Sequence, residues 1–332
     1  IKYIPRIDAT EMSRNNLLAE AYTLRAYLYF VLVRTWGGVP LRVEPTEGYN
    51  PETVQKERAT EEEVFRLIKE DLDNAIALYH DNTFWASRNR FSKPCANALK
   101  ADVYLWTAKR CGGGNADLET ALAACNEVQQ ADVMLLSNFG DLFEYNNKCN
   151  DEVIMSVAND IYDGGDNYFK DNYSGIDGSS TDPVDGEVIG TGTNGMAWAG
   201  SDLVKNQFME DDSRKAPSFT DGLRGGENGE IEYPALIRKG RGIVQNGHRY
   251  FRNDFVLYRL ADVLLTKAEA KNALGQDPSE EMNLIRKRAY GDNFEKHIFV
   301  SRSKELNDEE ILKERLLELV FEGKRWWDLV RF

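Results

Sequence analysis

Residues 314–332 combine regularly spaced carboxylates with basic and aromatic side chains. Glu314, Glu318 and Glu322 recur every four residues, so on a helix they share one face, with neighbouring Cβ atoms about 6 Å apart. This separation resembles that of the carboxylate pair in a glycoside hydrolase. Those enzymes, however, hold their acids on opposite sides of a sugar, whereas acids on one helix face point the same way. We therefore predict surface ion pairs with nearby basic residues such as Arg315.

An apolar stripe accompanies these acids and predicts that the segment is a packed helix. The stripe consists of Leu312, Leu316, Leu319 and Val320. Trp326 and Trp327 follow, and adjacent helical residues point about 100° apart, so these two rings cannot form one flat stacking platform. We interpret them as core or interface anchors at the helix end.

Other familiar site motifs lack the context that their chemistry needs. Gly190–Gly195 has the glycine spacing of a dinucleotide-binding loop, but no strand–helix alternation surrounds it. His80, His248 and His297 show no zinc-ligand spacing. The acidic stretch Asn159–Asn172 lacks the glutamate that closes an EF-hand loop. Weak binding of a calcium ion at the surface of this stretch stays open. We predict no cofactor, metal ion or catalytic residue.

Composition and charge limit the classes of partner that the chain could bind. The 332-residue chain has a net charge of −14, which would repel nucleic acid. No run of 18 apolar residues predicts a membrane-spanning helix, and the first ten residues lack signal-peptide zones. Cys95 and Cys125 lie on apolar stretches of predicted helices, which favours buried thiols, while the pairing of the four cysteines stays open.

Helical patterns fill both ends of the chain. Apolar residues at helical spacing, Leu17 to Val31, precede a Gly-Gly-Val-Pro stop, and Thr60 with Glu63 has the spacing of a capping box. Asn307 resembles a second cap. The predicted helices cover roughly 12–36, 60–79, 92–110, 117–130, 255–275, 278–289 and 311–323.

A repeated motif links the two helical ends. Ala101–Ala108 (ADVYLWTA) aligns with Ala261–Ala268 (ADVLLTKA), and each precedes a glycine break and a second helix. Hairpins at about 92–130 and 254–290 have the length of tetratricopeptide-type repeats, which bury their stripes only against neighbours. We expect these distant hairpins to stack into one superhelix.

The middle of the chain has a different amino-acid composition. Residues 140–247 contain 17 of the 26 glycines, and one strand is predicted at Glu152–Ala158. Tyrosine, phenylalanine and tryptophan side chains give this stretch apolar surface that it can bury in a core, which argues against disorder. We expect one mostly α domain over 1–332, with helical repeats at 1–135 and 254–332 and a loop-rich lobe with short strands at 136–253.

Four segments resemble the successive signatures of the SusD/RagB family of cell-surface glycan-binding lipoproteins of Bacteroidetes. They are EAYTLRAYLYFVLVRTWGGVPL (20–41), FVLYRLADVLLTKAEAKNALG (255–275), LIRKRAY (284–290) and ILKERLLELVFEGKRWWDLVRF (311–332). They follow the family's order and span nearly the whole chain. In that family the last segment is scaffold, which agrees with the packed helix predicted above.

The resemblance implies a SusD-like function. Such proteins bind oligosaccharides without cleaving them and act with a TonB-dependent SusC-like transporter at the outer membrane, facing outward on an N-terminal lipid anchor. This chain shows neither a lipoprotein signal nor the acylated cysteine, and it lacks the family's longer N-terminal region and C-terminal tail. We therefore expect it to be truncated at both ends, with the anchor as its only link to the membrane.

Sugars stack their C–H faces on aromatic rings and offer hydroxyls to Asp, Asn and Arg side chains. We expect each glycan-contacting ring to have a polar neighbour in a loop. The predicted pairs are Trp198 with Asp202, Tyr173 with Asn172, and Trp85 with Arg88. The alternative is that each ring only pins its loop to the scaffold.

Two other functions stay open for the whole chain. A helical-repeat adaptor would bind protein alone and no glycan. A glycoside hydrolase would release sugar on prolonged incubation.

Overall fold

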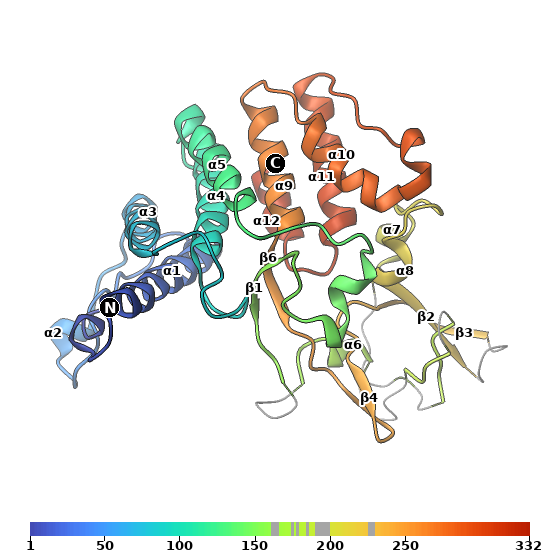
Figure 1. Cartoon of the computed structure of the whole chain (residues 1–332), viewed down its shortest axis with the longest axis horizontal. Coiled ribbons are helices and arrows are strands. Elements are labelled where there is room, and N and C mark those ends of the chain that lie inside the picture. Colours follow the sequence, from blue (N-terminus) through green and yellow to red (C-terminus); the bar gives the residue numbers. More distant parts are fainter. Residues whose placement is uncertain (161–165, 174–175, 177–178, 184–185, 190–199, 225–229) are drawn as a thin grey trace. The chain divides into compact units, whose positions relative to one another are not determined.

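Helices dominate the computed structural model, which describes all residues except 161–165, 174–175, 177–178, 184–185, 190–199 and 225–229 (Figure 1). The chain forms two compact units. The first comprises residues 1–133, 269–276 and 331, and the second comprises 134–268, 277–330 and 332.

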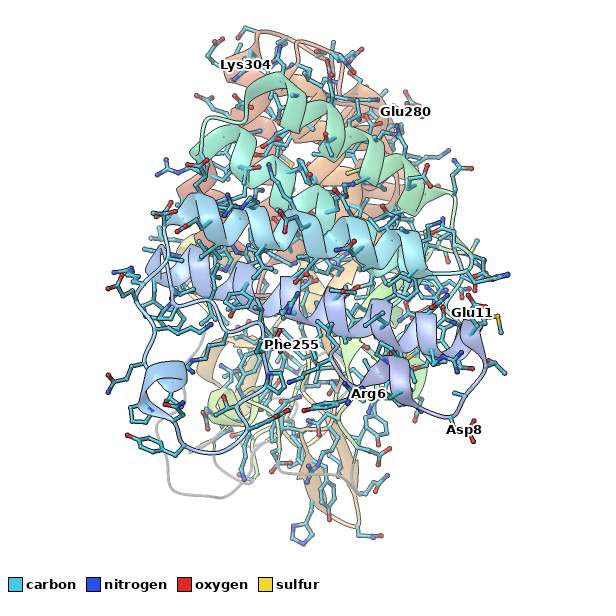
Figure 2. All side chains as sticks on the ribbon, turned by 90° about the vertical axis from the view of Figure 1, so that its left-hand side faces the viewer. Arg6, Asp8, Glu11, Phe255, Glu280 and Lys304 are labelled. Carbon is cyan, nitrogen blue, oxygen red and sulfur yellow. The ribbon has the colours of Figure 1, made fainter. Side chains whose placement is uncertain are left out.

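Four helices build most of the first unit: α1 (Glu11–Trp36), α3 (Glu61–Leu78), α4 (Lys93–Arg110) and α5 (Gly114–Gln129). Each packs against the next along the chain, so the helices lie side by side (Figure 2). The short helices η1 (Ile4–Arg6) and α2 (Pro51–Val54) complete this part of the chain. The fold confirms the predicted N-terminal helices.

The predicted capping box begins α3. The Thr60 amide donates to Glu63 Oε2 at 2.8 Å, and the Glu63 amide donates to Thr60 Oγ1 at 3.2 Å. Two amide donors at the helix start are thereby satisfied, which fixes where α3 begins.

The buried face of α1 is not the one marked by its leucines. Ala26, Phe30 and Val33 are buried, whereas Leu24 and Leu28 are 44% and 50% exposed. Apolar residues surround this helix on all sides, so periodicity identifies the helix without selecting the face that packs.

The end of α9 (Leu260–Ala273) belongs to the first unit. Ala270 packs with Leu105, Leu118 and Ala121 of the α4–α5 hairpin. Glu269 binds Lys109 Nζ at 2.8 Å and Arg331 through two contacts of 2.9 Å. Residues 269 and 270, which directly follow the second copy of the repeated motif, thus contact the hairpin that carries the first copy.

The second unit combines helices with small sheets. Its other main helices are α10 (Ser279–Tyr290), α11 (Lys304–Leu319) and α12 (Arg325–Arg331). Within the part of this unit that the structure describes, three antiparallel strand pairs accompany them: β1 (Val153–Val157) with β6 (Phe255–Arg259), β2 (Phe219–Arg224) with β3 (Glu230–Ile237), and β4 (Ile243–Gln245) with β5 (His248–Tyr250). The predicted strand at 152–158 is therefore confirmed.

Short helices occupy several of the remaining stretches of the second unit. They are η2 (Gly140–Phe143), η3 (Tyr145–Asn147), α6 (Lys170–Tyr173), α7 (Asp202–Lys205), α8 (Lys215–Ser218) and η4 (Gly291–Lys296).

Two predicted helix starts were wrong. Residues 255–259 form β6, which pairs with β1, and α9 begins only at Leu260. Helix α11 begins at Lys304 under the Ser303 cap, because the buried Asn307 side chain instead accepts the Arg302 amide at 2.8 Å. At β6 the pairing with a distant strand overrides the local helical pattern, whereas at α11 a different local cap, Ser303, sets the start of the helix.

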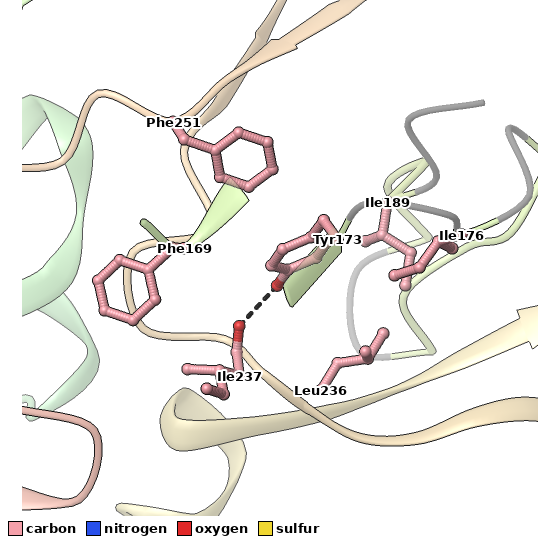
Figure 3. Packing of buried hydrophobic residues seen from close by; sticks show 7 residues of the cluster. All are labelled: Phe169, Tyr173, Ile176, Ile189, Leu236, Ile237 and Phe251. Carbon is pink, nitrogen blue, oxygen red and sulfur yellow. Dashed lines mark hydrogen bonds between the residues drawn. The ribbon is translucent and has the colours of Figure 1, made fainter. Parts of the chain in front are cut away.

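A hydrophobic cluster orders the strand-containing part of the second unit. Figure 3 shows its members converging from segments distant in sequence: Phe169, Tyr173, Ile176, Ile189, Leu236, Ile237 and Phe251. The aromatic content of the glycine-rich middle therefore builds a core, as its composition predicted.

Two general features of the chain can be read from the described residues. All four cysteines lie among them and the structure joins none in a disulfide; Cys95 and Cys125 are buried, as predicted. Within the described ranges, no helix combines the length and apolar character that crossing a bilayer requires.

Candidate functional site

The three glutamates of the closing segment lie inside the second unit. Glu314, Glu318 and Glu322 are 1%, 0% and 9% exposed. The prediction of surface ion pairs is therefore wrong about their location. It also missed their main partners, which come from other segments of the chain.

Arg259, at the end of β6, is central to this buried network. Its guanidinium donates to Glu318 Oε1 at 2.6 Å, Glu322 Oε2 at 2.7 Å and Glu152 Oε1 at 2.7 Å. Lys239 Nζ also donates to Glu322 Oε1, at 2.7 Å. Bidentate guanidinium geometry satisfies several carboxylate oxygens together, which makes burial of these charges tolerable.

Further arginines complete the network. Arg214 contacts Glu314 at 2.7 Å and Glu318 at 3.2 Å, and Arg288 bridges Glu152 and Glu318. The basic members are therefore Arg214, Lys239, Arg259 and Arg288, with Arg286 joined through Glu314 at 2.7 Å.

The electrostatics of this network are unsuited to acid catalysis. Burial alone would raise the pKa of Glu318, but attraction to Arg288, Arg259 and Arg214 outweighs burial and holds that pKa well below its usual value. Burial opposes the shift at Glu322 too, and Arg259 and Lys239 again lower the pKa. A glycosidase acid needs a raised pKa and room for a sugar. Glu318 and Glu322 have neither, and they link the closing segment to other parts of the second unit.

The structure places Tyr173 and Asn172 in the core. Both side chains are 0% exposed. Tyr173 Oη donates to the Ile237 carbonyl at 2.7 Å (Figure 3), and Asn172 Oδ1 accepts the Ile237 amide at 3.0 Å. With no exposed ring face, Tyr173 is not available for stacking on a sugar. The predicted pair therefore serves as a clamp on the end of β3.

Trp85 lies in the loop between α3 and α4 and is 37% exposed. The guanidinium that covers its ring, 4.8 Å from the centroid, belongs to Arg90, which Glu20 Oε1 holds at 2.9 Å. Arg88, the predicted partner, is 8% exposed, lies over the Phe84 ring and donates to a backbone carbonyl at position 132. Trp85 keeps an accessible ring, while Arg88 has a structural position.

Only one member of the remaining predicted pair, Trp198 with Asp202, lies among the described residues. Trp198 lies outside the described residues. Asp202 is exposed at the start of α7, where Ser201 Oγ accepts the Leu203 amide at 3.2 Å. Its carboxylate is therefore accessible to a ligand.

A hollow of about 240 Å³ in the second unit was missed by sequence reasoning. We call it the Tyr145 hollow. It lies between η2, η3, α8 and the turn after β3, and its functional groups are one phenol ring, one amide, two carboxylates and two guanidiniums. These belong to Tyr145, Asn138, Asp141, Glu144, Arg238 and Arg241.

Local contacts position these groups. Asn138 Nδ2 donates to Asp141 Oδ1 at 2.8 Å, and Lys148 Nζ lies 4.2 Å from the centroid of the Tyr145 ring. Arg241 Nη1 donates to Asp182 Oδ2 at 3.0 Å. The hollow thus offers a ring, donors and acceptors in one place, as sugar recognition requires.

Glycine at position 242 is needed for this geometry. Its φ is +76°, and a Cβ there would lie 2.0 Å from the Tyr250 carbonyl oxygen. Only glycine permits that close approach, which carries the turn holding Arg241 to the hollow. The local sequence around Tyr145 held no signal to distinguish this tyrosine from others in polar loops.

Helical hairpins that carry a lobe of loops and small sheets define a SusD-like protein, and the comparisons agree: the chain belongs to the SusD/RagB family. The SusD family model matches residues 227–332. A second model, described as starch-binding associating with outer membrane, matches residues 3–105.

Solved structures and curated relatives support this assignment. The chain is similar to B. fragilis NanU, with 34% identity and a TM-score of 0.85, covering 99% of this chain and 73% of that one. A SusD superfamily protein from Bacteroides vulgatus is 31% identical with a TM-score of 0.81, covering 99% and 75%. SusD-like protein P38 of Formosa agariphila is 28% identical, over 100% of this chain and 68% of the relative.

A further solved structure, obtained with a xylogluco-oligosaccharide, is 23% identical with a TM-score of 0.76 and shares the fold; the match covers 99% of this chain and 68% of that one. The chain spans between 60% and 68% of the length of the curated relatives it matches.

Proposed function

We propose that this protein is a non-catalytic subunit that binds oligosaccharide at the cell surface and passes it to a TonB-dependent, SusC-like transporter of the outer membrane. The Tyr145 hollow is the observation that carries the proposal, because it joins an aromatic ring to both hydrogen-bond donors and acceptors. The family assignment and the fold shared with the xylogluco-oligosaccharide structure support it.

The chemistry of the closing segment supports the proposed absence of catalysis. Glu318 and Glu322 are buried, ion-paired and held ionised by their lowered pKa values. Neither can donate a proton to a glycosidic oxygen near neutral pH. Intact oligosaccharide after prolonged incubation is the expected result, and released sugar would overturn this part of the proposal.

The glycan contacts that we propose lie at several rings. Tyr145 lines the hollow, Trp85 is accessible in its loop, and Trp198 with the exposed Asp202 keeps its place as a predicted pair.

Calorimetric titration with a panel of oligosaccharides tests the proposal. Tyr145→Ala should weaken binding roughly three- to tenfold, because an aromatic contact contributes about 0.5–1.5 kcal/mol beyond burial. Trp85→Ala and Trp198→Ala enter the same assay. Tyr49→Ala is the matched control, since that ring is 81% exposed in the first unit and outside the hollow. A folded protein that binds no glycan would instead favour a protein-binding adaptor.

A further inference from the structure

The Tyr145 hollow is too small to enclose an oligosaccharide. Its volume of about 240 Å³ lies below the range of roughly 300–1,000 Å³ that is usual for sites enclosing drug-sized ligands. A hollow of this size suits a single sugar unit. If the ligand is a longer chain, its other units must lie elsewhere on the surface.

A second hollow lies directly beside the first. It has a volume of about 410 Å³ and is lined by α7, the turn 209–213, α8 and the start of β2. Ala216 lines both hollows, while Lys215 lines only the second and Pro217 only the first. We call residues 215–217 of α8, which border the two hollows, the α8 ridge; Ala216 is exposed there.

The chemistry of this second hollow is polar. Lys205 Nζ contacts Asp221 Oδ1 at 2.6 Å, and Lys215 pairs with Glu210. Phe219, its aromatic lining residue, is only 3% exposed. Sugar hydroxyls would bind here by hydrogen bonds rather than by ring stacking.

Charge balance indicates the class of glycan. The second hollow is lined by two lysines and by four carboxylates, those of Glu210, Asp211, Asp212 and Asp221, and the Tyr145 hollow is lined by two arginines and two carboxylates. The chain as a whole carries a net charge of −14. Neither hollow offers an excess of positive charge to a polyanion, so a neutral chain fits best.

We infer that the ligand is a neutral linear oligosaccharide that crosses the α8 ridge, with one unit in the Tyr145 hollow and further units in the second hollow. The inference rests on the proposed function and adds the minimum length and the charge of the ligand. A methyl group at position 216 lets the glycan pass, whereas a larger side chain there would separate the two hollows.

Calorimetry with a series from mono- to hexasaccharide tests the inference, using the neutral glycan found by the panel and an acidic series beside it. The affinity should rise at least tenfold between the di- and the tetrasaccharide. Ala216→Leu should bring this ratio close to one. Ala116→Leu, an exposed alanine on α5 of the first unit, is the matched control and should keep the ratio of the parent protein.

The outcomes separate the two proposals. Binding whose affinity does not change with length, or an Ala216→Leu variant that keeps the full ratio, overturns the inference and leaves glycan binding intact. Tighter binding of the acidic series overturns the charge assignment. Failure of every glycan to bind a protein with an unchanged thermal transition overturns both proposals.

Discussion

Tyr173 and Asn172 show how two side chains can hold a strand end in place. Both bond Ile237, one through its carbonyl and one through its amide, at 2.7 and 3.0 Å. Buried backbone groups must be paired, and here side chains of α6 satisfy the last residue of β3. The aromatic ring therefore acts inside the protein and not on a ligand.

Tyr173→Phe should destabilise the second unit by about 1 kcal/mol, because the Ile237 carbonyl loses its buried donor while the ring is retained. Glycan affinity should not change. Denaturant unfolding and calorimetry measure the two effects separately. A loss of affinity with unchanged stability would return Tyr173 to the set of ligand contacts.

Glu318 connects α11 to three arginines from other segments. Its negative charge should therefore contribute more to the stability of the fold than its hydrogen bonds do. Glu318→Gln keeps the shape but leaves Arg214, Arg259 and Arg288 with one carboxylate fewer. Breaking a buried ion pair in this way typically costs about 3–5 kcal/mol. Thermal unfolding at pH 7 should show a clear loss of stability.

The same residue predicts a pH dependence. Its folded pKa lies below the ordinary value of 4.5, so its ionised form stabilises the protein above about pH 4.5. That stabilisation is lost as the pH falls through the folded pKa. Between about pH 5 and pH 3 the melting temperature of the parent should therefore fall more steeply than that of Glu318→Gln. Parallel slopes would show that folding does not lower the pKa of Glu318.

Helix α11 is also held by its apolar stripe. Leu319 is 2% exposed, and Leu319→Asp would bury a carboxylate without a partner, at a cost of several kcal/mol. Leu329→Asp on α12 is the control, because that side chain is 53% exposed. Equal melting temperatures for the two variants would contradict the assignment of α11 to the core.

The molecule as a whole should function in a complex. If the proposed function is correct, affinity purification of the protein from native outer membranes should recover a TonB-dependent β-barrel transporter. The expected ratio is close to one to one by quantitative mass spectrometry. An unrelated outer-membrane lipoprotein purified in the same way is the control. Recovery of the protein alone from intact membranes would count against the transporter partnership.

The affinity of the protein for its glycan should depend little on ionic strength. The proposed ligand is neutral, so no counterions are released when it binds, in contrast to a polyanion on a basic surface. Affinities measured at about 50 mM and 500 mM salt should agree within twofold. A steep loss with salt would indicate an ionic ligand.

Short-range patterns were sufficient for much of this architecture. The Thr60–Glu63 capping box, the strand at 153–157 and the paired ADV motifs were all readable along the chain, and the family followed from four local segments. Helix periodicity and capping depend on residues three or four positions apart, so the sequence displays them directly.

The site was decided by contacts between distant segments. Glu318 meets Arg259 from 59 positions away, and Tyr173 meets Ile237 from 64 positions away. Whether an aromatic ring in a polar loop is buried or exposed depends on which segment packs over it. Neighbours in sequence do not specify that segment. Tyr145 became a candidate only because α8 and the turn after β3 fold beside it, which no local pattern around that tyrosine records.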